Sequence, residues 1–175
     1  MAKKGLSGKH LAMSIGLVLL SFGLTALLWG LQDQVKSLGG YGYLGVFLFA
    51  LAANMPVVTV FPWLLVIAPL GAVYNPGLLA VTAASGATLG ELLPYALGSN
   101  IAPNLPSTGI LRRLTRLNMW QRTIVVLGMS LSPAFSFPGL AAGVLRYPLW
   151  ATLSMKFVTE LPKVYLVTEG WHWLG

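Results

Sequence analysis

The sequence predicts an all-α integral membrane protein with an inverted repeat. One N-terminal transmembrane helix would precede two copies of a re-entrant hairpin followed by a transmembrane helix. Three observations support this. Only 9% of the 175 residues are charged, against about 25% in a soluble domain. No charge occurs in the 54 residues between Lys36 and Glu91. Proline and glycine clusters recur in the same order in both halves. We therefore treat residues 1–175 as a single membrane domain.

The composition also excludes several functional classes. The absence of cysteine excludes disulfides, thiolate metal sites and cysteine nucleophiles. Two histidines at opposite ends and four scattered acids offer no metal cluster, and the serines near residue 132 have no partner histidine. We expect no metal, no cofactor and no enzymatic activity. The net charge of +7 comes largely from bases that flank apolar segments, which indicates positive-inside bias rather than nucleic-acid binding.

Residues 11–31 form the first uncharged segment, and its length suits one transmembrane helix. Lys3, Lys4 and Lys9 precede it, which places the N-terminus in the cytoplasm. A signal peptide is the alternative. Its apolar core would be about 7–15 residues long and followed by small residues, whereas this segment has 21 residues and ends in Leu-Leu-Trp-Gly-Leu. We favour a retained helix.

Residues 41–74 are apolar but interrupted by Asn54-Met-Pro56, Phe61-Pro62 and Pro69-Leu-Gly71. Proline lacks a backbone donor and breaks a helix, and such breaks persist in a membrane only where protein or a wet cavity satisfies the freed carbonyls. The pattern predicts a broken, re-entrant hairpin. Two kinked spanning helices are the alternative.

Residues 76–98 read as a transmembrane helix with proline in its first turn. Gly86-x-x-x-Gly90 gives it the small-residue face of tightly packed membrane helices. Residues 109–120 then form a short amphipathic helix. Its basic side chains are expected to face anionic lipid head groups at the cytoplasmic surface; they are Arg112, Arg113 and Arg116.

The second half repeats this pattern. Residues 123–145 form an uncharged segment broken by Pro133 and by Pro138-Gly139, which predicts a second re-entrant hairpin. Residues 148–173 form the last transmembrane helix, which ends in an aromatic belt.

The prolines align between the halves with small deletions. Pro56, Phe61-Pro62, Tyr74-Asn75-Pro76 and Glu91-Leu-Leu-Pro94 match Pro133, Phe137-Pro138, Tyr147-Pro148 and Glu160-Leu-Pro162, at offsets that fall from 77 to 69. With a cytoplasmic N-terminus, the first hairpin enters from outside and the second from inside, and the C-terminus lies outside. Two hairpins that approach each other from opposite faces are typical of transporters with a midplane site.

Glu91 is the first candidate site residue, because a lone acid within hydrocarbon must be protonated, paired or exposed to water. Pro94 leaves the Gly90 carbonyl without its usual helical donor, which adds an acceptor beside Glu91. A proton or cation site is one interpretation, and a structural acid bonded to a neighbouring helix is the other.

Lys156, Glu160 and Lys163 lie on one face of the last helix, and Pro162 frees a carbonyl beside them. This face should point into the bundle and leave a surplus positive charge, which together with Arg146 would attract an anionic head group such as a phosphate. Alternatively, Lys163 extends to the outer interface and Arg146 is an ordinary cytoplasmic anchor.

The sequence resembles the DedA/VTT (SNARE-associated Golgi protein-like) superfamily over about residues 42–167. The resemblance rests on Gly and Pro motifs: Phe61-Pro62-x-Leu-Leu, Gly86-x-x-x-Gly90-x-x-x-Pro94-Tyr95-x-Leu97-Gly98, and Ser132-Pro133 through Pro138-Gly139-Leu-Ala-Ala-Gly143-Val-Leu-Arg146. It implies two facing re-entrant loops and lipid transport. Bacterial relatives recycle polyprenyl-phosphate carriers, and eukaryotic relatives scramble phospholipids.

The sequence departs from the better-known DedA pattern at three positions. Leu64 stands where that pattern has an acid, and Ser130 and Ser136 stand where it has arginines. A shorter, less charged branch is the closer match, and the departures weaken the expectation of proton coupling and phosphate clamping.

Taken together, the sequence predicts a transporter that moves an amphipathic, anionic lipid between leaflets of the bacterial inner membrane. One alternative is a proton-coupled exporter of small cationic compounds that uses Glu91 and Glu160. Another is a non-transporting scaffold, which would have no wet cavity between the hairpins. Membrane lipids are the expected partners, nucleic acid is not, and a homo-oligomer is left open.

Overall fold

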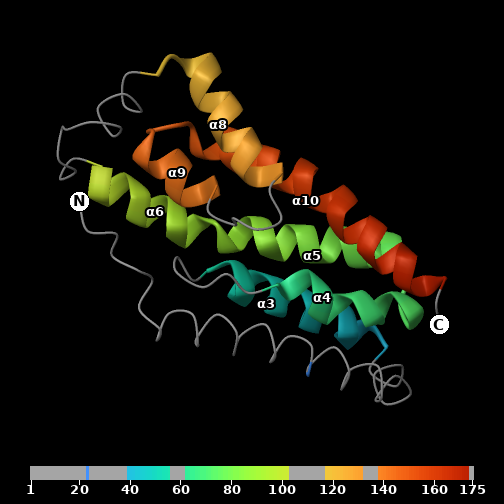
Figure 1. The fold of residues 1–175 in the computed structure, drawn as a ribbon. Helices are drawn as coiled ribbons and strands as arrows, with labels where there is room; N and C mark the ends of the chain where they lie inside the picture. Colours follow the sequence, from blue (N-terminus) through green and yellow to red (C-terminus); the bar gives the residue numbers. More distant parts are fainter. Residues whose placement is uncertain (1–22, 24–38, 56–61, 103–116, 132–137, 174–175) are drawn as a thin grey trace, which may run out of the picture.

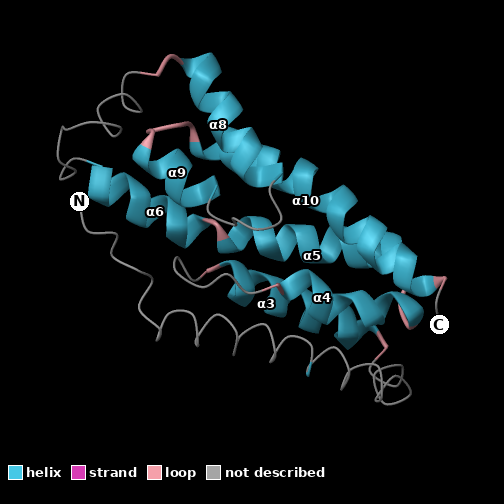
Figure 2. Ribbon diagram, in the orientation of Figure 1, coloured by secondary structure: helices cyan, strands magenta, loops and turns pink. Residues whose placement is uncertain are grey.

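The computed structural model describes residues 39–55, 62–102, 117–131 and 138–173, together with Gly23. These residues form helices and the loops and turns that join them, and no strand occurs among them (Figure 2). The predicted helix at 11–31, apart from Gly23, lies outside the described residues, as do residues 109–116 of the predicted amphipathic helix. The same is true of two of the predicted hairpin breaks and three predicted lipid-facing bases: Pro56, Pro133, Arg112, Arg113 and Arg116.

The region of the first predicted hairpin contains two separate helical arms. The first arm is α3 (Gly40–Asn54), and the second consists of α4 (Trp63–Ile67) followed by the 3-10 helix η1 (Ala68–Ala72). Pro62 is the N-cap of α4. The arms have 15 and 10 residues, fewer than the roughly 20 that a spanning helix needs.

Next comes a long apolar helix in two pieces, α5 (Pro76–Gly90) and α6 (Leu92–Ile101). The Asn75 side chain caps α5 by accepting a hydrogen bond from the Leu78 amide at 3.1 Å, and Pro76 occupies the first turn. Among the described residues, Pro76–Ile101 is the one helix long and apolar enough to cross a membrane. The predicted end at residue 98 was therefore three residues early.

The junction between α5 and α6 lies at Glu91, which the sequence had placed inside an uninterrupted helix. Pro94 supplies no amide hydrogen for the Gly90 carbonyl, so the regular bonding pattern is broken here. The Glu91 amide donates to the Thr88 carbonyl at 3.2 Å, a tighter turn than an α-helix makes. The break sets the carboxylate of Glu91 at a bend.

The second half contains α8 (Met119–Leu131), α9 (Pro138–Val144) and α10 (Leu149–His172). The predicted amphipathic helix was wrong at its end, because 117–118 are not helical and Met119 and Trp120 form the first turn of α8. The cause is a reciprocal cap: the Gln121 amide donates to Asn118 Oδ1 at 3.0 Å, and the Asn118 amide donates to Gln121 Oε1 at 3.1 Å.

The last helix, α10, has 24 residues and continues through Pro162. It begins at Leu149 with Pro148 as its N-cap and ends at His172, one residue inside each predicted boundary. Its length suits a transmembrane helix, and that it spans the membrane stays a prediction.

The helices exchange partners between the two halves (Figure 1). Helix α5 lies between α3 and α10, whereas α6 packs mainly on α9 and η1 packs on α10. The second arm of each hairpin region thus contacts the long helix of the other half.

Glycines permit these close contacts. A Cβ atom added to Gly86 or Gly90 would overlap the backbone of α3, and one added to Gly98 would overlap the Leu140 carbonyl of α9. A Cβ on Gly71 of η1 would overlap the Thr168 carbonyl of α10. Such contacts are what the Gly86-x-x-x-Gly90 spacing predicts.

Substitution of Gly98 by alanine should destabilise the protein by about 1–3 kcal/mol, because the new methyl group meets the α9 backbone. Gly128 in α8 is the matched control, since its Cβ position is open. There the same substitution should stabilise by up to about 1 kcal/mol, through helix propensity. Thermal unfolding in detergent measures both, and equal shifts for Gly98→Ala and Gly128→Ala would contradict the packing described.

Candidate functional site

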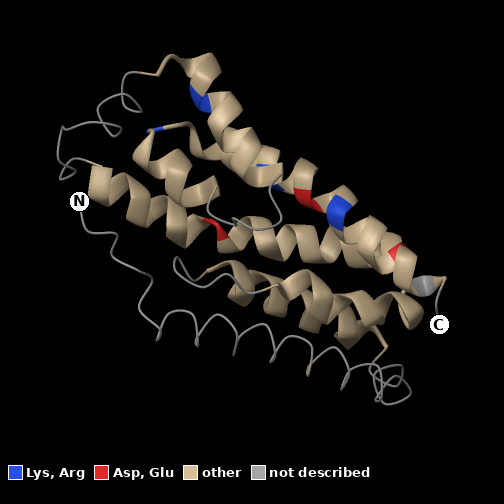
Figure 3. Ribbon diagram, in the orientation of Figure 1, with Lys and Arg blue, Asp and Glu red and all other residues tan. Residues whose placement is uncertain are grey.

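Four charged side chains from the two long helices meet inside the bundle, and we call them the four-charge cluster: Glu91, Lys156, Glu160 and Lys163. Lys156 Nζ lies 3.4 Å from Glu91 Oε1 and 3.3 Å from Glu160 Oε2. Glu160 also forms an ion pair with Lys163. Glu91 is 0% exposed, and Lys156 and Glu160 are each 1% exposed. Figure 3 shows how few charged residues the surrounding helices carry.

The cluster also contacts the two helices of the second hairpin region, α8 and α9. The backbone amide of Gly139, in the first turn of α9, donates to Glu91 Oε2 at 2.9 Å. Lys163 Nζ donates to the Ser130 carbonyl, near the end of α8, at 3.0 Å. An acid at a helix N-terminus and a base at a helix C-terminus are the favourable placements for the helix dipoles. A Cβ on Gly139 would overlap Glu91, so glycine is needed for this approach.

The cluster is balanced in charge, with two acids and two bases. The prediction of a surplus positive charge was wrong. It counted the charges of α10 alone, whereas Glu91 at the α5–α6 junction supplies the second acid that pairs with them. Balance is physically required here, since an unpaired charge within a low-dielectric interior costs several kcal/mol. The cluster by itself therefore presents no net charge to a head group.

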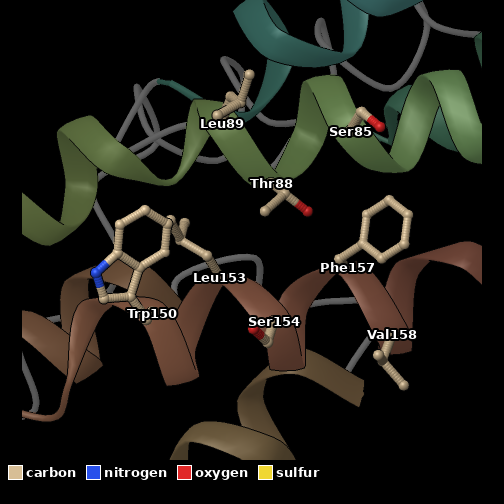
Figure 4. A pocket seen from close by; sticks show the side chains of 8 residues that line it. All are labelled: Ser85, Thr88, Leu89, Trp150, Leu153, Ser154, Phe157 and Val158. Atoms are coloured by element: carbon tan, nitrogen blue, oxygen red, sulfur yellow. The ribbon is translucent and has the colours of Figure 1, made fainter.

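An open groove of about 550 Å³ lies between α5 and α10, next to the cluster in sequence on both helices. Its lining combines apolar side chains with three hydroxyl groups (Figure 4). The lining residues are Ser85, Thr88, Leu89, Trp150, Leu153, Ser154, Phe157 and Val158. On α10 they extend over about 12 Å of helix axis, which is more than a third of a hydrocarbon layer of about 30 Å.

Arg146 lies apart from the cluster, exposed in the turn between α9 and α10. It has a φ of 51°, in the left-handed region that favours glycine. The Tyr147 amide donates to the Ala142 carbonyl at 2.8 Å, and the Arg146 amide donates to the Gly143 carbonyl at 3.0 Å. These two bonds make a Schellman cap, with arginine in the position usually held by glycine.

The remaining predicted residues are prolines and a glycine that shape the helices and carry no charged group. Pro138 and Gly139 begin α9, Pro94 lies buried in α6, and Pro162 lies within α10. The sequence did not single out Thr88, Ser154 or the carbonyl of Ser130 as site groups. A usable signal existed for Thr88 alone, since it precedes Glu91 by three residues and so lies on the same side of the helix.

A comparison with protein-family models decides the family, because the VTT domain matches residues 61–169, more than half of the chain. The chain belongs to the VTT-domain family. This is the DedA/SNARE-associated Golgi protein family that the sequence motifs resemble. No curated protein and no solved structure matches the chain in the same comparisons.

The VTT-domain match includes the second arm of the first hairpin region, all four charges of the cluster and the whole groove. Proteins of this family are membrane proteins that are commonly linked to transport or to lipids. The all-helical architecture agrees with an all-α membrane protein. The site described here is therefore part of the VTT domain.

Removing one charge from the cluster should destabilise the protein strongly. Glu91→Gln leaves Lys156 in excess, and Lys156→Met leaves the acids in excess, at an expected cost of about 3–5 kcal/mol each. The double variant restores neutrality, so its cost should be clearly smaller than the sum of the two. Thermal unfolding in detergent measures the cycle. Glu169→Gln, near the end of α10, is the control, and strictly additive costs would contradict the coupling.

Replacing Arg146 by glycine should stabilise the protein by about 1–2 kcal/mol, because glycine adopts the left-handed conformation without strain. Arg146→Ala removes the same charge but keeps the Cβ atom, so it should give no such gain. The two unfolding temperatures separate backbone strain from charge. If alanine stabilised as much as glycine, the strain at this turn would not be the cause.

Proposed function

We propose that this VTT-domain protein moves an amphipathic membrane lipid between leaflets, with the groove between α5 and α10 as its path. The lipid would be an anionic one of the phospholipid or polyprenyl-phosphate type. The observation that carries the proposal is the groove itself: an open groove with hydroxyl-bearing residues among apolar ones, formed by the apolar helix Pro76–Ile101 and the long helix α10.

The groove addresses the main barrier to lipid movement. A polar head group that enters hydrocarbon loses its hydrogen bonds with water, at a cost of several kcal/mol. The hydroxyls of Ser85 on α5 and Ser154 on α10 can replace part of these bonds while the acyl chains stay in the bilayer beside the open side. Leu153 and Phe157 supply apolar contact for the upper part of the chains.

The four-charge cluster would have a supporting role in this path. Its ion pairs connect the α5–α6 junction to α10 and fix the ends of α8 and α9. The described parts of the arms support re-entrant hairpins, since each of these described helical segments is shorter than a spanning helix. The groove would then lie beside the point where two hairpins approach the midplane.

The inner membrane is the proposed location, with the N-terminus in the cytoplasm and the C-terminus outside. This orientation puts Arg146 and the basic segment around Arg112 on the cytoplasmic side, where they would attract anionic lipid to the groove. We infer a transporter rather than an enzyme.

Neither alternative from the sequence is favoured by a specific contact. Glu91 and Glu160 are both paired with lysine, so neither is a lone acid available to couple export to protons. A scaffold protein would not need an open groove lined by apolar and hydroxyl-bearing residues.

Liposomes that contain the purified protein test the proposal. A fluorescent phospholipid in the inner leaflet should become accessible to a membrane-impermeant quencher faster than in protein-free liposomes. Ser154→Trp fills the groove and should lower the rate toward the protein-free value. Leu166→Trp places the same ring on the exposed face of α10 outside the groove and should leave the rate unchanged. No movement of any phospholipid or polyprenyl phosphate would overturn the proposal.

A further inference from the structure

The two long helices carry the same repeated motif in different conformations. Glu91 and Glu160 are the acids of the two Glu-Leu-(Leu)-Pro copies, 69 residues apart. At Glu91 the helix is interrupted and α5 gives way to α6, whereas α10 is continuous from Leu149 to His172. Each copy contains a proline, Pro94 or Pro162, that removes one amide donor from its helix. The same local weakness thus produces a bend in one copy and none in the other.

The groove between α5 and α10 follows the same repeat. Ser154 follows Ser85 by 69 residues, the spacing that separates the two acids, and Val158 follows Leu89 by the same number. Both walls of the groove therefore contain equivalent segments of the two copies. Each wall ends two residues before the acid of its motif. A bend at either acid consequently alters the end of one wall.

One lysine pairs with both acids. Lys156 Nζ lies 3.4 Å from Glu91 Oε1 and 3.3 Å from Glu160 Oε2, so the ammonium group is almost equally distant from the two. Lys156 is buried, and a buried ammonium group that lost every partner would cost several kcal/mol. If the helix moves at one acid, Lys156 keeps its ion pair with the other. Neither movement therefore leaves this lysine unpaired.

We propose that the two long helices bend alternately while lipid moves, so that α5 and α6 form one straight helix when α10 bends at Glu160. The described conformation is then one of two states, and each state alters a different wall of the groove. Transporters with inverted repeats open to the two sides of the membrane in turn by moving one repeat against the other. This inference rests on the proposed lipid movement and adds the conformational change that accompanies it.

Hydrogen exchange of the backbone amides, measured on the protein in liposomes, tests whether the two helices are coupled. Pro94→Ala gives the Gly90 carbonyl its missing donor, which should favour the straight form of α5 and α6 by at least about ten-fold. Amides of residues 89–95 should then exchange more slowly. Amides of residues 157–164, whose sequence is unchanged, should exchange at least about ten-fold faster, because α10 is bent more often. A purely local effect of the substitution would not change α10.

Pro76→Ala is the matched control. This proline lies in the first turn of α5, where it removes no donor from an intrahelical bond, so hydrogen exchange near both acids should equal that of the wild type. Pro162→Ala restores the donor for the Val158 carbonyl and should hold α10 straight. Phospholipid movement in the liposome assay should then fall at least about ten-fold. Pro162 is exposed whereas Pro94 is buried, so this second variant remains testable if Pro94→Ala does not fold.

The outcomes separate this proposal from the proposed function. Unchanged hydrogen exchange at residues 157–164 in a folded Pro94→Ala variant would overturn alternate bending, and so would lipid movement at the wild-type rate by Pro162→Ala. The hydrogen-exchange measurement needs no transported lipid. A coupled response of the two helices without movement of any lipid would therefore overturn the proposed function alone.

Discussion

The position of Lys156 between two buried acids is the constraint on which the rest of the structure depends. Its ammonium group lies within ion-pair distance of Glu91, at the α5–α6 junction, and of Glu160, one turn along its own helix. A buried lysine without such partners would be too costly to keep charged. The pairing therefore fixes α10 against the junction, and the neighbouring contacts of Gly139 and Ser130 then fix α9 and α8.

The two acids also connect the structure to the internal repeat. Glu91 and Glu160 occupy equivalent places in the repeated motif Glu-Leu-(Leu)-Pro, and both contact the same lysine. In each case a proline follows within three residues and removes one amide donor from the helix. Each copy of the motif therefore places an acid next to a helical segment that lacks one backbone hydrogen bond. In the first copy the backbone breaks at Glu91, and in the second α10 stays continuous through Pro162.

Much of this fold could be predicted from the sequence, because a membrane chain offers strong signals: uncharged length, proline breaks and small-residue faces. The membrane class, the family, the two arms of residues 41–74 and the common face of Lys156, Glu160 and Lys163 followed from these. The charge balance could not be predicted, since it depends on which helix faces α10. The start of α8 could not be predicted from hydropathy either, because it is set by the side-chain cap between Asn118 and Gln121.

The exchange of partners between the halves has a consequence for biosynthesis. The second arm of the first hairpin region packs on α10, where Gly71 meets Thr168 almost a hundred residues later in the chain. That arm is too short to span a bilayer, and its final partner is synthesised much later than the arm itself. The arm therefore lacks its native packing partner while the second half is synthesised. The packing of η1 on α10 can therefore form only after α10 has been synthesised.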